Sequence, residues 1–317
     1  MKQSVFILGS FVVDLTAKAA WLPTEGETIK GNYFKIGPGG KGANQAVAAV
    51  RAGADVQLMT KIGQDLFSPV AIDSFTQESL MSNLVLIDKN NPTGIALIMV
   101  SEDGANQILV VPGASACITE DDLLCAKQAI STSRIFLTQL EVNIDAVEKA
   151  IDVAYTNQVE VILNPAPAQP VRDDLYNKID YITPNETETK LLTGYDVADL
   201  DGCHLAAKYF FDRGVKNVLI TLGGLGVYVN NREMFSLIPA MSVHVVDTTG
   251  AGDAFNGAFA ASLDAGEDVF AAALFANVAA GLSVQSFGTA PAMPYRRDIV
   301  KALKEWNVRP DLQVFNS

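Results

Sequence analysis

The sequence predicts an α/β protein with a doubly wound, mainly parallel sheet flanked by helices and a small β-strand lid. Short apolar runs at 5–8, 57–61, 135–137, 159–163, 181–183 and 218–221 have the length of buried strands. Longer helical patterns, such as the Ala-rich stretch 42–52, separate these runs. This alternation is typical of a parallel sheet with helices on both faces.

A pair of β-rich runs interrupts the alternation and predicts the lid. Residues 93–100 and 106–111 flank an Asp-Gly pair, Asp103-Gly104, which is a hairpin signal. Residues 27–35 are also strand-like, and such an antiparallel element suits a lid over a site at the strand ends. Since neither a linker nor a repeat divides the chain, we expect residues 1–317 to form a single domain, with lid strands from about 11–36 and 93–111.

Composition argues against several classes of protein. The 317 residues carry 23 Lys and Arg against 36 Asp and Glu, a net charge of −13. An acidic surface repels nucleic acid and anionic lipid, so we expect neither a nucleic-acid nor a membrane partner. The 3 cysteines show no metal-binding spacing and no disulfide framework. The apolar run near the N-terminus is too short for a signal or a membrane span, so we expect a soluble, cytoplasmic protein.

The most informative segment is Asp247-Thr248-Thr249-Gly250-Ala251-Gly252-Asp253. It follows a β-like run at 243–246 and precedes a long helical stretch, 254–263, so its glycines fall at a helix N-terminus. Free backbone amides and the helix dipole make such a terminus an anion site. A carboxylate beside an anion site can act as a general base toward a hydroxyl that attacks a phosphate. The alternative is that Asp253 only caps the helix.

A second Gly-rich segment, residues 37–46, also precedes a helix. Lys41 and Asn44 are three residues apart, so both can face one side of the first helical turn. The segment is not a phosphate-binding Walker A loop, because Gly42 follows Lys41 where Ser or Thr is needed. It can form a polar floor for a small polyol, or it can be a loop with a solvated lysine.

A third segment, residues 183–188, opens another helical pattern. Asn185 and Glu188 have N-x-x-E spacing, so their side chains meet on one helix face. Amide and carboxylate oxygens suit a hydrated Mg²⁺ that bridges phosphates. The same spacing also describes a simple capping box.

Together these segments resemble the ribokinase (PfkB-type) carbohydrate kinase family, from about residue 4 to residue 294. The likeness rests on Gly-Gly-Lys-Gly-Ala-Asn-Gln-Ala at 39–46 and Asp-Thr-Thr-Gly-Ala-Gly-Asp-Ala-Phe-Asn-Gly at 247–257, with Leu-Asn-Pro-Ala-Pro-Ala at 163–168 and residues 183–188 in support. The resemblance implies an ATP-dependent kinase that phosphorylates a sugar, with a β lid through which subunits often form homodimers.

The resemblance also implies a role for individual residues. Asp253 would be the catalytic base and Gly250, Ala251 and Gly252 the anion hole. The sugar would be held by Asp14, Gly40, Lys41, Asn44 and Glu141. The ATP site would include Asn185, Thr221, Gly223, Gly226 and Asn277, with Glu188 serving Mg²⁺ through phosphates or water. A monovalent cation, usually K⁺, would lie near Asp247, Thr249, Ser283, Ser286 and Gly288.

One position departs from the family pattern. Ribokinases usually carry Asn two residues before the substrate-binding Asp, and here that position is Val12. Kinases of 2-deoxyribose resemble this chain in having an apolar residue there, and an apolar patch favours a sugar that lacks a hydroxyl. Because the other sugar contacts keep the ribose pattern, we predict phosphorylation of the 5-hydroxyl of D-ribose, with 2-deoxyribose or another sugar as the alternative substrate.

Two other classes of protein fit the sequence less well. A dinucleotide-dependent oxidoreductase needs G-x-G-x-x-G directly after an early strand, and Gly9 is followed by Ser10-Phe11-Val12. A non-catalytic sugar-binding regulator would be expected to have lost the base or the anion hole, and both motifs are intact.

Overall fold

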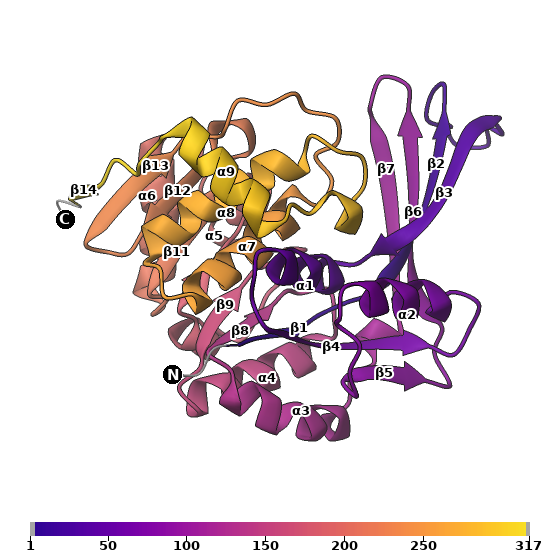
Figure 1. The fold of residues 1–317 in the computed structure, drawn as a ribbon, viewed down its shortest axis with the longest axis horizontal. Coiled ribbons are helices and arrows are strands. Elements are labelled where there is room, and N and C mark those ends of the chain that lie inside the picture. The colour runs from indigo at the N-terminus through magenta and orange to yellow at the C-terminus, as the bar shows by residue number, and fades with distance from the viewer. Residues whose placement is uncertain (1–3, 315–317) are drawn as a thin grey trace.

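A ten-stranded sheet forms the centre of the protein in the computed structural model, which describes residues 4–314 (Figure 1). Its order is β14-β13-β12-β11-β10-β9-β8-β1-β4-β5. The parallel strands are β1 (Val5–Leu8), β4 (Val56–Gly63), β5 (Val85–Asp88), β8 (Ile135–Thr138), β9 (Glu160–Leu163), β10 (Tyr181–Ile182) and β11 (Asn217–Thr221). The antiparallel strands β12 (Val227–Asn230), β13 (Met234–Ile238) and β14 (Gln313–Val314) extend one edge.

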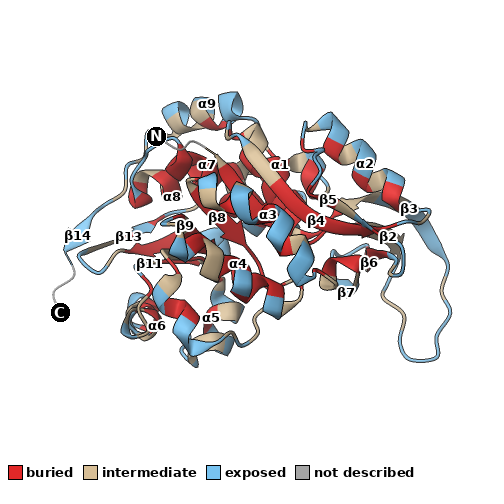
Figure 2. Cartoon of the chain, turned by 90° about the horizontal axis from the view of Figure 1, so that it is seen from below, coloured by how far each residue is buried: buried red, intermediate tan, exposed pale blue. Residues whose placement is uncertain are grey.

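Helices cover both faces of this sheet, as the alternation of runs predicts. One layer holds α1 (Lys41–Arg51), α2 (Ser68–Gln77), α7 (Ala251–Asp264), α8 (Val269–Ser283) and α9 (Arg296–Trp306). The other holds α3 (Glu120–Thr132), α4 (Ile144–Thr156), α5 (Glu186–Thr193) and α6 (Leu200–Asp212). Side chains of a strand point alternately to the two faces. In β1, Val5 and Ile7 therefore join the first core, whereas Phe6 and Leu8 join the second, and all four are fully buried. Central strands such as β4 and β8 are largely buried, whereas the outer faces of the helices are exposed (Figure 2).

The lid is a separate four-stranded sheet that projects from one end of the molecule (Figure 1). Its strands are β2 (Val12–Ala19), β3 (Gly31–Gly39), β6 (Thr93–Ser101) and β7 (Asn106–Gly113), in the order β3-β2-β6-β7. The hairpin predicted around Asp103-Gly104 is confirmed as β6–β7. The sheet is mixed rather than wholly antiparallel, since its central pair, β2 and β6, is parallel.

Two strand predictions are corrected. The run 27–35 is a strand only from Gly31, which pairs with Ala19. The run 243–246 is not a strand, although it leads into α7 as expected. Its β-branched residues match strand propensity, but Val245 and Val246 are 54% and 51% exposed. Propensity without a burying face does not make a strand.

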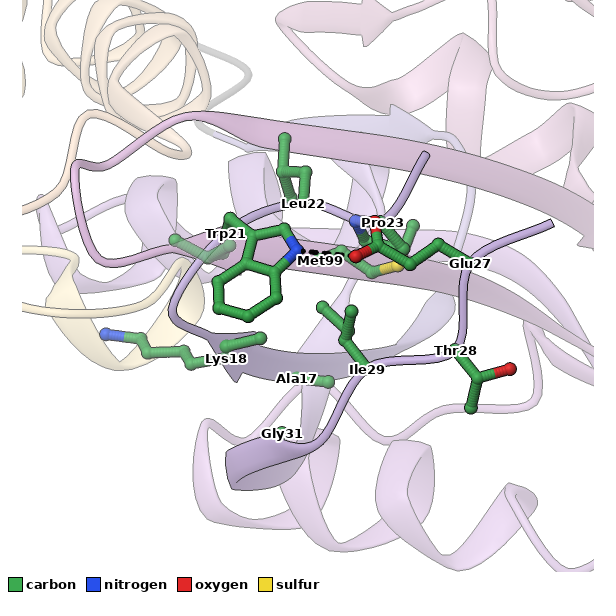
Figure 3. A pocket seen from close by; sticks show the side chains of 12 residues that line it. Ala17, Lys18, Trp21, Leu22, Pro23, Glu27, Thr28, Ile29, Gly31 and Met99 are labelled. Carbon is green, nitrogen blue, oxygen red and sulfur yellow. Dashed lines mark hydrogen bonds between the residues drawn. The ribbon is translucent and has the colours of Figure 1, made fainter. Parts of the chain in front are cut away.

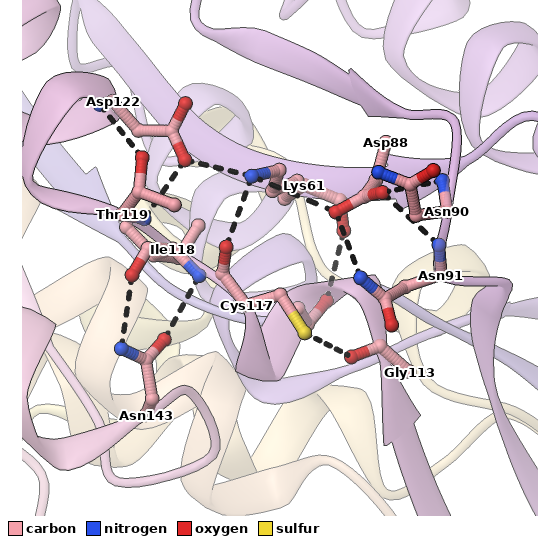
Figure 4. A network of polar contacts seen from close by, with 11 residues as sticks. Lys61, Asp88, Asn90, Asn91, Gly113, Cys117, Ile118, Thr119, Asp122 and Asn143 are labelled. Carbon is pink, nitrogen blue, oxygen red and sulfur yellow. Dashed lines mark hydrogen bonds and ion pairs between the residues drawn. The ribbon is translucent and has the colours of Figure 1, made fainter.

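The lid is tied to the main sheet by buried polar contacts at its base. Ser115, after β7, accepts a hydrogen bond from the Phe11 amide at 3.1 Å and donates to the Phe11 and Lys61 carbonyls. Beside it, Lys61 donates to Asp122 at 2.8 Å and lies 3.6 Å from Asp88 (Figure 4). These contacts fix where β2 leaves the body, and hence where the side chains of β2 lie over the sheet.

Candidate active site

The N-terminus of α7 presents the backbone amides of Gly250 and Gly252, whereas the Ala251 amide donates to the Thr248 carbonyl at 3.2 Å. Its N-cap is Gly250, which has a left-handed backbone (φ 81°) and provides no side-chain cap. A Cβ placed on Gly252 would meet no atom within 4 Å, so the space above this turn is open. The helix thus begins where the sequence predicts, and its first turn can accept an anion.

Asp253 lies in this first turn and is held by two side-chain amides of α1. Asn44 donates to its Oδ2 at 2.9 Å, and Gln45 donates to its Oδ1 at 3.0 Å. The residue is 7% exposed, and burial raises the pKa of its carboxyl, while Lys41 and the two amide donors oppose that rise. Asp253 does not cap the helix; instead it faces the pocket at the helix start.

The pocket measures about 160 Å³ and gathers residues from segments far apart in the sequence. Its lining comprises Lys41, Asn164, Ala166, Thr183, Asn185, Glu188, Thr221, Thr248, Gly250, Ala251, Gly252, Asp253 and Asn256. A whole small-molecule ligand usually needs roughly 300–1,000 Å³. The enclosed volume therefore corresponds to one end of a larger ligand, such as a phosphate group.

Lys41 opens α1 and brings positive charge to this pocket. Its backbone amide donates to Glu141 Oε2 at 2.9 Å. This hydrogen bond connects the Gly-rich segment to Glu141, which lies in the loop after β8. Burial disfavours the charged amine, but the carboxylates of Asp253, Glu141 and Glu188 outweigh it and raise the pKa of Lys41. A charged lysine beside the anion site supplies the local field that the acidic chain otherwise lacks.

Asn185 and Glu188 satisfy both interpretations of their spacing. They form a capping box, in which the Asn185 side chain accepts from the Glu188 amide at 2.8 Å and Glu188 accepts from the Asn185 amide at 2.9 Å. Both also line the pocket with Thr221, whose strand forms a bridge to Asn185. Burial raises the pKa of Glu188. Cap formation thus does not remove these side chains from the site.

Asp14 enters the region from the lid. Its carboxylate lies over Gly39, where an added Cβ would clash with it. Burial, together with Glu141 and Asp253, raises the pKa of Asp14 from 3.8 to about 7. Val12, two residues earlier, is 3% exposed and packs near Gly94.

Gly40, at the foot of the lid, has φ 92° and approaches the Phe11 and Val12 backbone so closely that a side chain would clash. This close approach joins the lid strand to the start of α1.

The remaining predicted ATP residues are not among those that line this pocket. Gly223 and Gly226 belong to the turn after β11, where Gly226 (φ 105°) has no room for a Cβ against the Ile238 carbonyl. Asn277 of α8 donates to the Pro239 carbonyl at 2.6 Å.

The segments predicted to hold a monovalent cation are brought together. Asp247 accepts hydrogen bonds from the amides of Thr249 and Gly288, each at 3.0 Å. Ser283 is buried and its hydroxyl donates to the Ala280 carbonyl, whereas Ser286 is exposed. Within residues 4–314, no group of three or more His, Cys, Asp or Glu has the arrangement of a metal site.

Six residues of the site were given no role from the sequence: Gln45, Asn164, Ala166, Thr183, Thr248 and Asn256. Gln45 follows Asn44 directly in an Ala-rich helix and is fully buried. A glutamine within such an apolar stretch indicates a buried side chain that needs a hydrogen-bond partner. Asn164 and Thr183 each follow the end of a parallel strand, where ligands bind in such sheets.

The comparisons with known proteins agree with this geometry. The model of the pfkB family of carbohydrate kinases matches residues 2–296. The chain belongs to this family. It is 38% identical to a ribokinase of Haemophilus influenzae over 96% of this chain and 99% of that one. It is also 38% identical to a deoxyribokinase of Salmonella typhi, over 92% of this chain and 96% of that one.

Solved structures give the same result for this pfkB-family chain. A structure of Arabidopsis thaliana ribokinase complexed with ribose and ATP matches with a TM-score of 0.87 and 31% identity, over 96% of this chain and 99% of that one. The chain is thus a sugar kinase, a phosphotransferase, and the predicted family and fold are confirmed. In the part of the chain from residue 4 to 314, no helix is both long and apolar enough to cross a bilayer.

Proposed function

We propose that this sugar kinase transfers the γ-phosphoryl group of ATP to the 5-hydroxyl of D-ribose, with Asp253 as the general base. The observation that carries the proposal is that the Asp253 carboxylate and the helix-start residues Gly250, Ala251 and Gly252 line one pocket. An in-line phosphoryl transfer needs a proton acceptor beside the attacking hydroxyl and an anion site that stabilises the transferred phosphoryl group.

In the proposed reaction the sugar lies between the lid and the Gly-rich loop. Asp14, Gly40, Lys41, Asn44 and Glu141 hold its hydroxyls. Asp253 accepts the proton of the 5-hydroxyl as the oxygen forms its bond to the γ-phosphorus, and the bond from that phosphorus to the β-phosphate oxygen breaks to release ADP. Backbone amides at 250–252 stabilise the transferring group, since donors aimed at developing charge are the strongest catalytic device of such a site.

ATP as the phosphoryl donor is supported by the relatives, among which an Arabidopsis thaliana ribokinase was solved with ATP and a Cryptococcus neoformans ribokinase with ADP. Asn185 and Thr221 would contact the phosphates, with Gly223, Gly226 and Asn277 farther along the nucleotide. Three carboxylates, Asp253, Glu141 and Glu188, act on Lys41, so a bound cation would help to offset their charge against the phosphates.

The oxygen donors of the pocket fit Mg²⁺. Glu188 and Asn185 offer carboxylate and amide oxygens, the ligands this ion prefers, and they would hold it through water and phosphate oxygens. K⁺ would lie between two segments of the protein and contact mostly backbone carbonyls. One segment contains Asp247 and Thr249, and the other contains Ser283, Ser286 and Gly288. Both ions would neutralise phosphate charge when bound.

We also propose a homodimer formed through the lid. Leu15 pairs with Ile36 and with Leu97, and Leu97 pairs with Leu109, so these four side chains share the face opposite to Asp14. Phe34, Ile36, Leu97, Leu109 and Val111 are between 41% and 62% exposed. An apolar patch of this extent indicates a protein interface.

A pocket of about 320 Å³ adjoins this face, beneath Trp21 and beside Met99, Ile29 and Leu22 (Figure 3). In the proposed dimer, side chains from the lid of the second subunit would fill this pocket. In sedimentation experiments the wild type should be a dimer, and Leu109→Asp should be a monomer of unchanged helix content. A wild type that remains monomeric at micromolar concentration would contradict the dimer.

The substrate is tested with a panel of ribose, 2-deoxyribose, fructose and a nucleoside, each with Mg-ATP and K⁺. The proposal predicts the highest kcat/KM for ribose and a product phosphorylated at the 5-position. A clear preference for 2-deoxyribose would instead support the alternative that Val12 and the Salmonella typhi relative suggest. If none of the four substrates stimulates ATP consumption, the result would contradict the proposed phosphorylation of each of them.

A further inference from the structure

A chain of buried side-chain amides lies against Asp253. Gln45 and Gln139 are fully buried, and Asn164 is 6% exposed. Gln45 donates from its single Nε2 to both Asp253 Oδ1 and Asn164 Oδ1, at 3.0 Å each. Gln139 Nε2 donates to Gln45 Oε1 at 2.6 Å. Buried polar groups of this kind need a reason to be present, because apolar side chains of the same volume would cost less to bury.

The direction of every amide in this chain follows from one backbone group. The Thr183 carbonyl can only accept, so the atom of Asn164 that lies 3.0 Å from it must be the Nδ2 donor. Asn164 Oδ1 then faces Gln45 and must receive a donor, which fixes Gln45 Nε2 toward Asn164 and Asp253. Gln45 Oε1 in turn requires a donor and receives Gln139 Nε2. A flip of Gln45 would place its oxygen against two acceptor oxygens at once.

We propose that Gln45 is a positioning residue for catalysis: its amide nitrogen, directed through Asn164 by the Thr183 carbonyl, holds the Asp253 carboxylate in its proton-accepting orientation. The inference rests on the proposed role of Asp253 as the base. With Asn44 on Oδ2 and Gln45 on Oδ1, each carboxylate oxygen has one fixed donor, and neither donor can supply a proton. The remaining lone pairs are left for the hydroxyl of the substrate.

The same contact favours the ionised form of Asp253 and so opposes the rise in its pKa that burial causes. Lys41 of α1, Glu141 after β8, Glu188 of α5 and Asp14 of β2 all act on it, and only the first of these is a cation. Hydrogen bonds donated to a carboxylate favour its charged form. Loss of the Gln45 donor should therefore move the acid limb of the rate profile to higher pH.

The test compares Gln45→Met, which keeps the volume and removes the donor, with Gln45→Glu, which keeps the shape and replaces the donor by an oxygen. Asn230→Leu is the control for the loss of a fully buried amide, since Asn230 bonds Tyr228 and Arg232 outside the site. For each variant, kcat, the KM values for sugar and ATP, the pH profile and the melting temperature are measured.

We expect Gln45→Met to lower kcat by about 10- to 100-fold, the scale of a misplaced catalytic group. Its KM values should stay within about threefold of wild type, with the acid limb shifted upward. Gln45→Glu should lower kcat at least as far at pH 8, and it decides the matter if Gln45→Met does not fold. The control should lose stability with an unchanged kcat.

A kcat within twofold of wild type in a folded Gln45→Met or Gln45→Glu would overturn the inference, as would a loss confined to KM. Asp253→Asn, measured alongside, separates the two hypotheses. If Asp253→Asn retains turnover, the base itself is misassigned. If it is inactive while the Gln45 variants are normal, only the role of Gln45 is wrong.

Discussion

Gly252→Ala separates the catalytic role of the α7 N-terminus from its role in stability. Gly252 is the second residue of the helix, lines the pocket, and has ordinary helical backbone. A Cβ there would meet no atom within 4 Å, so the methyl group enters free space and not a packed core. The substitution therefore adds one carbon to the exact volume that the phosphoryl group is proposed to occupy.

The two expected effects have opposite signs. Alanine is favoured over glycine in a helix by roughly 0.5–1 kcal/mol, so the variant should unfold at the same or a slightly higher denaturant concentration. The methyl group should keep the transferring phosphoryl group away from the amide beneath it. Loss of one such donor costs about 2.7–4 kcal/mol in the transition state, which is roughly a 10²- to 10³-fold fall in kcat.

The assay pairs steady-state kinetics with chemical denaturation, and two glycines of the same segment serve as controls. Gly257→Ala should unfold readily, because its Cβ would lie 2.4 Å from the Gln45 carbonyl oxygen. Gly250→Ala should lose stability through its positive φ of 81°, by about 1–2 kcal/mol. A Gly252→Ala variant that is stable and turns over at the wild-type rate would refute the anion-hole assignment.

Three further predictions concern the lid and its base. Val12→Asn should raise the ratio of ribose to 2-deoxyribose kcat/KM by about tenfold, because an amide can pair with the additional hydroxyl; an unchanged ratio would remove Val12 as a determinant. Lys61→Met should lower the free energy of unfolding by about 3 kcal/mol, since it strands the buried Asp88 and the partly buried Asp122 carboxylates; a loss below about 1 kcal/mol in urea titrations would contradict this. Burial, with its acidic neighbours, raises the pKa of Asp14 from 3.8 to about 7, so the stability this group contributes is lost as pH rises through that interval. Asp14→Asn should accordingly gain stability relative to wild type at pH 8 but not at pH 4, and a difference that does not change with pH would show that Asp14 titrates normally.

The strands and helices that the sequence identified share a clear local signal. Val5–Leu8 is a four-residue apolar run that is completely buried, so its length and composition were enough to predict a strand. The start of α7 at Ala251 follows from Gly250, whose left-handed conformation stops any helix from beginning earlier. By contrast, 243–246 has the composition of a strand but no neighbouring strand, and pairing cannot be read from composition.

Site residues were found where they share a motif and were missed where only the fold brings them together. Asn185 and Glu188 are three residues apart, so their meeting was predictable. The partner of Gln45 at Asn164 is 119 residues away in the sequence, and their contact exists only because the fold brings α1 to the residue that follows β9. The raised pKa of Asp14 has the same origin, since it results first from burial in the fold and then from the carboxylates of Glu141 and Asp253, which lie in two other segments.

The most direct test of the account is a single-turnover experiment on Asp253→Asn with Mg-ATP and saturating ribose. The Asn side chain keeps the size of the carboxylate, so ribose binding measured by calorimetry should change little, whereas the phosphoryl-transfer rate should fall by roughly 10²-fold or more. Transfer at close to the wild-type rate, with ribose bound normally, would show that another group accepts the proton and that the proposed mechanism is wrong.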